Sequence, residues 1–288
     1  MLLWATLGGM AALVGFGVAD YLAGKSGKDT DPFLANLALQ AAALISWLVV
    51  VPFVSITQPS WFALGVSLAI GTLFTVAMAF YIKALDIGPF GVVAPLANSY
   101  AGITLILGVW WFGAMVSGME IALLALIVAG VFLLAADRTT FSLGNFHRSS
   151  VAIALVPLVA WGIAFALLDL LLAELAWYEM FLWTNLGAML AGIVLYLLVR
   201  RRVPSVASLT PGAMPLAWLA GVWIFLGASG IYVGADLAGS AVVPAVIASA
   251  SPLVTALLSA YRDHERLTWV KRVGAVVIVL GVSLLNVV

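Results

Sequence analysis

The sequence predicts an all-α membrane protein with ten transmembrane helices, arranged as two inverted five-helix repeats around a central cavity. Three observations predict this fold: a very hydrophobic composition, a one-sided distribution of basic residues, and a similarity between the two halves of the chain. Hydrophobic residues make up 65% of the 288 residues and charged residues only 8%. Because a soluble domain carries about a quarter charged residues, most of the outer surface of this protein must face lipid.

Ten apolar stretches follow one another, each close to the roughly 20 residues that one bilayer crossing needs. We expect the first five helices at 2–23, 33–56, 61–85, 92–112 and 120–136. We expect the second five at 151–173, 178–199, 213–235, 241–261 and 270–288. The longest connection, 137–150, separates five spans from five. The sequence therefore predicts an N-terminal repeat over residues 1–140 and a C-terminal repeat over residues 141–288.

The basic residues orient these spans relative to the membrane. All 12 Lys and Arg residues lie beside the odd-numbered connections, and the even connections and both termini have none. Cytoplasmic loops are enriched in Lys and Arg, so both termini are predicted to lie outside the cytoplasm. The distribution also supports the number of spans, since one missed helix would place basic residues on both sides. We expect a multi-pass protein of a prokaryotic inner (cytoplasmic) membrane.

The two halves of the chain align with each other. A shift of 151 residues relates spans three to five to spans eight to ten without a gap. The aligned pairs include Tyr81 with Tyr232, Thr104 with Thr255, Ile127 with Ile278 and Gly130 with Gly281. In addition, Phe16-Gly17 in span one corresponds to Trp161-Gly162 in span six. Because each half contains an odd number of spans, the repeat is inverted, as in many transporters that work by alternating access.

The end of the chain carries a recognisable pattern. Glu265-Arg266-Leu267-Thr268-Trp269, followed by Gly274 and the Gly-Val-Ser-Leu-Leu stretch at 281–285, resembles the closing signature of EamA-type domains in the drug/metabolite transporter superfamily. The Ala-Ser-Ala-Ser-Pro stretch at 248–252 and the Trp161-Gly162 pair fit the same family. The resemblance implies ten helices around a central cavity that exports or exchanges small metabolites, similar to amino-acid exporters of the YddG type.

Two departures limit that resemblance. The first repeat has Ala114 where the second has Glu265, so its copy of the closing signature is degraded. The small multidrug branch of the superfamily carries a proton-coupling Glu in its first helix, and the corresponding position here is Val14. The resemblance therefore does not imply proton–drug exchange of that kind.

Neutral polar and aromatic residues are the candidates to line the cavity, because almost no ionisable residue lies near the middle of a predicted span. Polar residues interrupt spans four and nine at equivalent positions. Aromatic residues occupy equivalent positions near the ends of spans three and eight, and one lies in the middle of span six. The expected cavity residues are Tyr81, Asn98, Tyr100, Trp161, Tyr232, Ser249 and Ser251.

Four ionisable residues, Asp20, Lys83, Asp86 and Asp169, lie within about one or two turns of predicted helix ends. They are candidates for gating or ion coupling, with an interfacial anchor as the alternative role. Lys83 and Asp86 lie three residues apart on one helix face, so we expect an ion pair that acts as a cytoplasmic gate. Transport is expected to run down the substrate's own gradient or to depend only weakly on pH.

Signatures of other protein classes are absent from the sequence. The chain has no cysteine, its two histidines lie far apart in predicted loops, and no phosphate loop or nucleophile elbow occurs. We therefore expect no enzyme activity, catalytic residue, metal or cofactor. The net charge of zero gives no indication of nucleic-acid binding. The expected partners are a small-molecule substrate and the lipid bilayer, and a monomer is compatible with the sequence.

The function favoured by the sequence is secondary transport, as an exporter or facilitator, of a small neutral or zwitterionic metabolite by alternating access. Aromatic and hydrophobic amino acids are the candidate substrates. The alternative is a proton-coupled drug or sugar transporter on the same fold. A membrane-embedded enzyme fits less well, because it would need catalytic groups that converge in the middle of the membrane.

Overall fold

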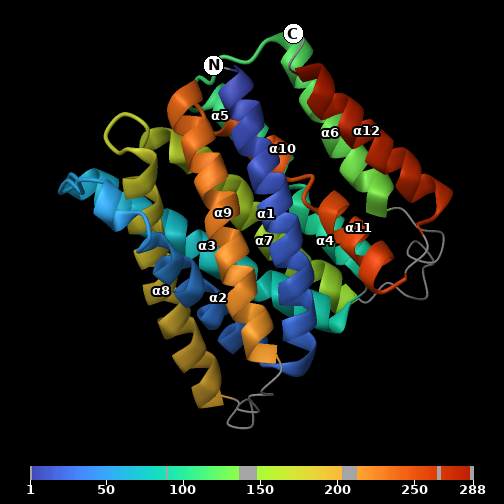
Figure 1. Ribbon diagram of the computed structural model, residues 1–288, viewed down its shortest axis with the longest axis horizontal. Coiled ribbons are helices and arrows are strands. Elements are labelled where there is room, and N and C mark those ends of the chain that lie inside the picture. Colours follow the sequence, from blue (N-terminus) through green and yellow to red (C-terminus); the bar gives the residue numbers. More distant parts are fainter. Residues whose placement is uncertain (1, 89, 136–147, 203–212, 265–266, 286–288) are drawn as a thin grey trace.

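The computed structural model describes residues 2–88, 90–135, 148–202, 213–264 and 267–285. Within these ranges the regular elements are helices (Figure 1). The first half contains α1 (Leu2–Asp29), α2 (Pro32–Trp47), α3 (Trp61–Ile87), α4 (Phe90–Asn98), α5 (Tyr100–Trp110) and α6 (Gly118–Ala135). The second half contains α7 (Arg148–Leu167), α8 (Trp177–Arg202), α9 (Ala213–Ala238), α10 (Val242–Ala248), α11 (Pro252–Arg262) and α12 (Trp269–Leu285).

Side-chain caps explain where several helices begin. The Asp31 carboxylate accepts hydrogen bonds from the backbone N–H groups of Phe33 and Leu34 at the start of α2, and Pro32 occupies the first helical position. The Ser60 hydroxyl accepts a hydrogen bond from the Ala63 N–H at the start of α3. Such caps satisfy N–H groups that have no partner within the helix itself.

Twelve described helices correspond to ten crossings, because α4 with α5 and α10 with α11 are each one interrupted crossing. Seven segments of the described chain are long and apolar enough to span a membrane. Leu96–Trp110 and Gly118–Leu134 are shorter apolar helices, and α12 provides the tenth crossing. The predicted fold class is therefore confirmed. The predicted boundary at residue 140 lies outside the described residues and stays a prediction.

Both ends of the helix bundle can be followed in Figure 1. The helix α1 begins and α12 ends at the same end, as an even number of crossings requires. We call this end the N/C end, and the end at which α1 finishes the opposite end. Which of the two ends faces the cytoplasm stays a prediction from the basic residues.

The packing of the helices repeats between the two halves, as the inverted repeat requires. The helix α1 packs against α9, and their repeat mates α7 and α3 pack against each other. At the residue level, Thr255 Oγ1 donates a hydrogen bond to the Gly17 carbonyl oxygen over 2.8 Å. Thr104 Oγ1 donates the equivalent bond to the Gly162 carbonyl oxygen over 3.2 Å. These two bonds match the pairings of Gly17 with Gly162 and of Thr104 with Thr255 found in the sequence.

The helices α6 and α12 lie side by side at one edge of the bundle (Figure 1). A Cβ atom added to Gly130 would lie 2.8 Å from Ile278 Cγ1, and one added to Gly281 would lie 2.7 Å from Ile127 Cγ1. Glycine is needed at both positions because the neighbouring side chain occupies the space. The two contacts are repeat mates of each other, so this helix pair lies on the pseudo-two-fold axis.

Candidate functional site

A central cavity lies between the two halves and contains about 770 Å³ of space not occupied by protein atoms. Helices from both repeats contribute to its lining. Its aromatic residues are Phe16, Phe74, Tyr100, Trp161, Phe165 and Tyr232. Its polar residues are Asp20, Gln40, Asn98, Thr184, Asn185 and Ser251. Aliphatic side chains complete the lining, so the cavity combines a mainly apolar surface with a few polar groups, as small-molecule sites commonly do.

The two interrupted helices bring polar groups to the cavity. One interruption lies between Asn98 and Tyr100, and the other between Ala248 and Pro252. Inside a membrane, backbone outside a regular helix is tolerated where it is buried in protein or lines a cavity. The two interruptions lie close together, since the Ser251 hydroxyl is within hydrogen-bond distance of Asn98 Oδ1, at 3.4 Å.

Asp20 lies in the wall of this cavity and is only 5% exposed. Its Oδ2 atom accepts a hydrogen bond from Ser251 Oγ over 3.2 Å. Within the described part of the chain, no Lys, Arg or His lines the cavity. The ion pairs formed by described residues, Lys25–Asp263 and Lys83–Asp86, do not involve Asp20. Among the residues that the structure describes, the cavity lining therefore contains one carboxyl group and no basic side chain.

The position of Asp20 corrects one expectation from the sequence. The first helix was predicted to end at residue 23, which placed Asp20 within a turn of its end. Instead, α1 continues to Asp29, so Asp20 lies nine residues before the helix ends. The apolar span within α1 runs from Leu2 to Ser26, and the Asp20 carboxyl group contacts Ser251, near the middle of the span Val242–Arg262. An ionisable group therefore lies inside the membrane-spanning part of the structure.

Four of the aromatic lining residues form one continuous wall. The rings of Tyr100 and Phe165 stack with centroids 4.9 Å apart and an interplanar angle of 28°. Phe165 also meets Phe74 edge-on at 4.9 Å, and Trp161 meets Tyr100 edge-on at 5.8 Å. Edge-to-face and offset contacts of this kind are the favoured geometries of aromatic pairs. Together they present a large, rigid apolar surface to the cavity.

Part of the chain is similar to a known family of proteins. Residues 148–287, which include α7 to α12, match the EamA-like transporter family. The match covers the second of the two five-helix halves, which is therefore similar to EamA-like transporters. Because this family consists of transporters, the expectation that the protein is not an enzyme is confirmed.

Two further comparisons concern the fold and curated relatives of the chain. One protein with a solved crystal structure matches 98% of this chain over 96% of its own length, with a TM-score of 0.73 and 19% sequence identity. At this level of identity the likeness shows the fold alone. No curated protein matches the chain.

The residues predicted to line the cavity divide into two groups. Asn98, Tyr100, Trp161, Tyr232 and Ser251 line the cavity. Tyr81 and Ser249 do not belong to the lining. The Tyr81 ring is fully buried against Trp161, with centroids 5.2 Å apart, and Ser249 Oγ donates a hydrogen bond to the Val246 carbonyl oxygen over 2.6 Å. Contact between any of these residues and a substrate stays a prediction.

The sequence interpretation missed several lining residues, namely Phe16, Gln40, Phe74, Phe165, Thr184 and Asn185. A signal for two of them exists in the sequence. Gln40 and Asn185 are separated by 145 residues, the same shift that relates Gly17 to Gly162. Amide side chains at equivalent positions of two apolar spans would have indicated a shared polar site.

The other ionisable candidates lie away from the cavity lining. Lys83 and Asp86 form an ion pair of 2.9 Å near the end of α3, and both side chains are partly exposed. Asp169 accepts hydrogen bonds from the Ala241 N–H over 2.6 Å and from the Ser240 hydroxyl over 3.1 Å. Asp169 therefore connects the end of α7 to the start of α10. The roles of these residues in gating or coupling stay predictions.

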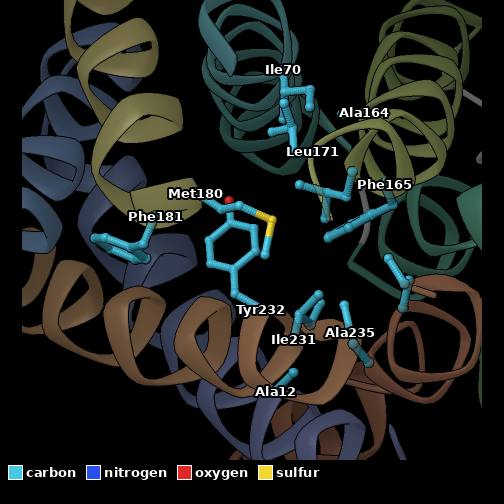
Figure 2. Close-up of a cluster of buried hydrophobic side chains, with 14 of the residues drawn as sticks. Ala12, Ile70, Ala164, Phe165, Leu171, Met180, Phe181, Ile231, Tyr232 and Ala235 are labelled. Atoms are coloured by element: carbon cyan, nitrogen blue, oxygen red, sulfur yellow. The ribbon is translucent and has the colours of Figure 1, made fainter. Parts of the chain in front are cut away.

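A buried apolar cluster lies toward the N/C end of the transporter. Figure 2 shows Leu171, Met180, Ile231 and Tyr232 of this cluster around a common centre. Tyr232 belongs both to the cluster and to the cavity lining, and its hydroxyl hydrogen-bonds the Thr184 hydroxyl over 2.9 Å. The cluster fills the space beside the cavity on the side where α7 ends and α8 begins.

Proposed function

We propose that this protein is a secondary transporter that moves a small neutral or zwitterionic metabolite across the membrane by alternating access. Aromatic and hydrophobic amino acids are the substrate candidates, and the protein acts as an exporter or facilitator similar to exporters of the YddG type. The observation that carries this proposal is the central cavity. Its stacked aromatic wall suits an apolar side chain, and its amide and hydroxyl groups suit the polar part of a metabolite.

The matched packing of the two halves supports the transport mechanism. In transporters built from inverted repeats, the halves adopt unequal conformations, and exchanging these conformations moves the opening from one side of the membrane to the other. The paired bonds Thr255–Gly17 and Thr104–Gly162 give both halves equivalent contacts at these positions. This correspondence supports a mechanism in which the halves exchange conformations.

The test is counterflow in liposomes that contain the purified protein. Labelled phenylalanine, leucine, glucose and uridine are compared, each with and without the same unlabelled compound inside. We expect phenylalanine and leucine to accumulate transiently and glucose and uridine not to. Equal rates in protein-free liposomes, or uptake of the sugar or nucleoside alone, would contradict the proposal.

A specific observation favours a second candidate, proton-coupled transport of a drug or sugar on the same fold. The expectation of weak pH dependence rested on the absence of an acid deep in the membrane, and Asp20 occupies such a position. A carboxyl group in a cavity that opens to each side in turn can take up and release a proton. In this case an imposed pH gradient drives accumulation against the substrate gradient, and Asp20→Asn abolishes it while Asp169→Asn does not. Accumulation that ignores the pH gradient favours the first candidate.

A further inference from the structure

Equivalent contacts in the two halves differ in chemistry at one position. Three residues after Gly17 lies Asp20, and three residues after Gly162 lies Phe165. The threonine bonds to Gly17 and Gly162 fix this register. Asp20 contacts Ser251, and Phe165 contacts Tyr100, which is the repeat mate of Ser251. The same helix–helix contact is therefore polar and acidic in one half and aromatic in the other.

Among the described residues, no cationic side chain contacts Asp20 at its contact with Ser251. Asp20 is buried, and the side-chain bond from Ser251 comes from a neutral hydroxyl whose single proton also lies within reach of Asn98. No basic side chain lines the cavity in the described chain. Burying a carboxylate in an apolar medium is costly unless the charge is paired. The position is thus suited to a positive group that a ligand brings with it.

The contact between Tyr100 and Phe165 offers an apolar surface for the rest of such a ligand. Tyr100 and Phe165 are stacked, and Trp161 and Phe74 extend the wall on either side. Since Asp20, Tyr100 and Phe165 all line one cavity, a single small molecule can contact the acidic and the aromatic positions together.

We propose that Asp20 binds the ammonium group of the transported molecule, while Tyr100 and Phe165 contact its aromatic or large apolar body. The substrate class is then an amine with such a body, and a free amino acid binds through the same ammonium group. A carboxylate on the ligand lies near Asp20 without a basic partner, so it weakens binding. This inference rests on the proposed function, because it assumes that the cavity is the substrate site.

The test uses four probes that share a phenyl body and differ in their polar group. They are 2-phenylethylamine, L-phenylalanine, 2-phenylethanol and 3-phenylpropionate, and their dissociation constants are measured calorimetrically with the protein in lipid nanodiscs. We expect the amine to bind most tightly, then the amino acid, the alcohol and the acid. The amine should exceed the alcohol by about tenfold or more, as expected for a hydrogen bond to a charged group. A wild-type protein that binds the acid best, or ignores the polar group, overturns the proposal without any variant.

Variants identify the residue responsible. Asp20→Asn should remove the preference for the amine over the alcohol, while the affinity for the alcohol changes by less than about threefold, because the alcohol makes no ion pair. Glu174→Gln, a control at an exposed acid outside the cavity lining, should keep the preference. Phe165→Leu should weaken the amine and the alcohol by the same factor, because it contacts only their common body. An amine preference that persists in Asp20→Asn contradicts the proposal. If Asp20→Asn does not fold, Asp20→Glu, which keeps the charge, should keep the preference, and its loss there contradicts the proposal.

Counterflow of the same probes separates this inference from the proposed function. If binding of the amine depends on Asp20 but no probe crosses the membrane, the ammonium site stands and the transport proposal fails. If phenylalanine crosses but the order of the probes is the same in wild type and Asp20→Asn, transport stands and the ammonium site fails.

Discussion

Each end of the helix bundle is held by a buried apolar cluster, but the polar contacts of the two ends differ. Toward the N/C end, the buried cluster around Leu171 and Met180 lies beside the carboxylate of Glu179, which is only 3% exposed. Glu179 Oε1 accepts hydrogen bonds from the Thr57 N–H over 2.7 Å and from the Thr57 hydroxyl over 2.6 Å. At the opposite end, the ion pairs Lys25–Asp263 and Lys83–Asp86 are partly exposed.

This difference concerns the polar contacts that hold each end in this conformation. Hydrogen bonds to a charged group contribute more to stability than exposed ion pairs do. Opening the N/C end requires repacking of the cluster around Leu171 and loss of the Glu179 hydrogen bonds. At the opposite end the ion pairs can break and re-form at little cost, while the buried cluster around Tyr81 and Ile82 must repack there as well.

The largest effect is expected from Leu171→Ala, which removes a fully buried side chain of the cluster. Such substitutions destabilise proteins by about 2–5 kcal/mol. The melting temperature in detergent should fall. A cysteine introduced at the buried Ala235 should also react faster with a maleimide, and the label reports only this site because the chain has no cysteine of its own.

The matched control is Leu219→Ala, since the Leu219 side chain is 47% exposed on the outer surface. Its effect on the melting temperature and on the maleimide reaction of the Ala235→Cys background should be much smaller. Equal effects of the two leucine substitutions would show that the cluster is not what holds the N/C end together.

A smaller effect is expected from Glu179→Gln, which replaces a charged acceptor by a neutral amide. Hydrogen bonds to charged groups contribute about 1.5–3 kcal/mol, so the melting temperature should fall, but less than in Leu171→Ala. In a double-mutant cycle, Thr57→Val should cost less in the Glu179→Gln background than in the wild type. The exposed Glu174→Gln serves as the control, and additive effects of Thr57→Val and Glu179→Gln would argue against a coupled pair.

Still smaller effects on stability are expected at the opposite end. Exposed ion pairs contribute about 0–1 kcal/mol and are screened by salt. Asp263→Asn and Lys83→Met should therefore leave the melting temperature nearly unchanged. In counterflow, Lys83→Met should alter the initial rate more than the final accumulation, as expected of a gate. A large loss of stability in either variant would mean that the two ends do not differ in the way described.

The last prediction assigns the two ends to the two sides of the membrane and involves no change in stability. We expect the N/C end to face away from the cytoplasm, because the basic residues lie at the opposite end. A reporter that is active only in the cytoplasm, fused after Val288, should be inactive. Labelling of a cysteine introduced at Ser60 by an impermeant reagent added outside intact cells should succeed, and labelling of one introduced at Asp86 should not.

Much of this fold could be predicted from the sequence because it depends on patterns that extend over many residues. Hydropathy and basic residues marked the ten crossings, and the ungapped shift of 151 residues marked the repeat. The spacing of Lys83 and Asp86 on one helix face predicted their ion pair, which forms at 2.9 Å. Each of these features depends on average composition or on spacing along one helix.

The cavity lining was harder to predict because it depends on which face of each helix turns inward. Tyr81 and Trp161 are both buried aromatic residues, yet Trp161 lines the cavity and Tyr81 lies behind it. Ser249 and Ser251 both lie in the interruption between α10 and α11, yet only Ser251 lines the cavity. The depth of Asp20 was misjudged because hydropathy ended the helix at the first polar residues, whereas the backbone stays helical to Asp29.

The reciprocal contacts between α6 and α12 have a consequence for how the two halves exchange conformations. Most contacts in an inverted repeat have a separate partner in the other half, so the exchange turns one geometry into the other. The Gly130–Ile278 contact has Gly281–Ile127 as its counterpart within the same helix pair. Exchanging the halves maps this pair of helices onto itself and leaves its arrangement unchanged. In the proposed transport cycle, we therefore expect the edge formed by α6 and α12 to stay fixed as a pivot, around which the remaining helices rock.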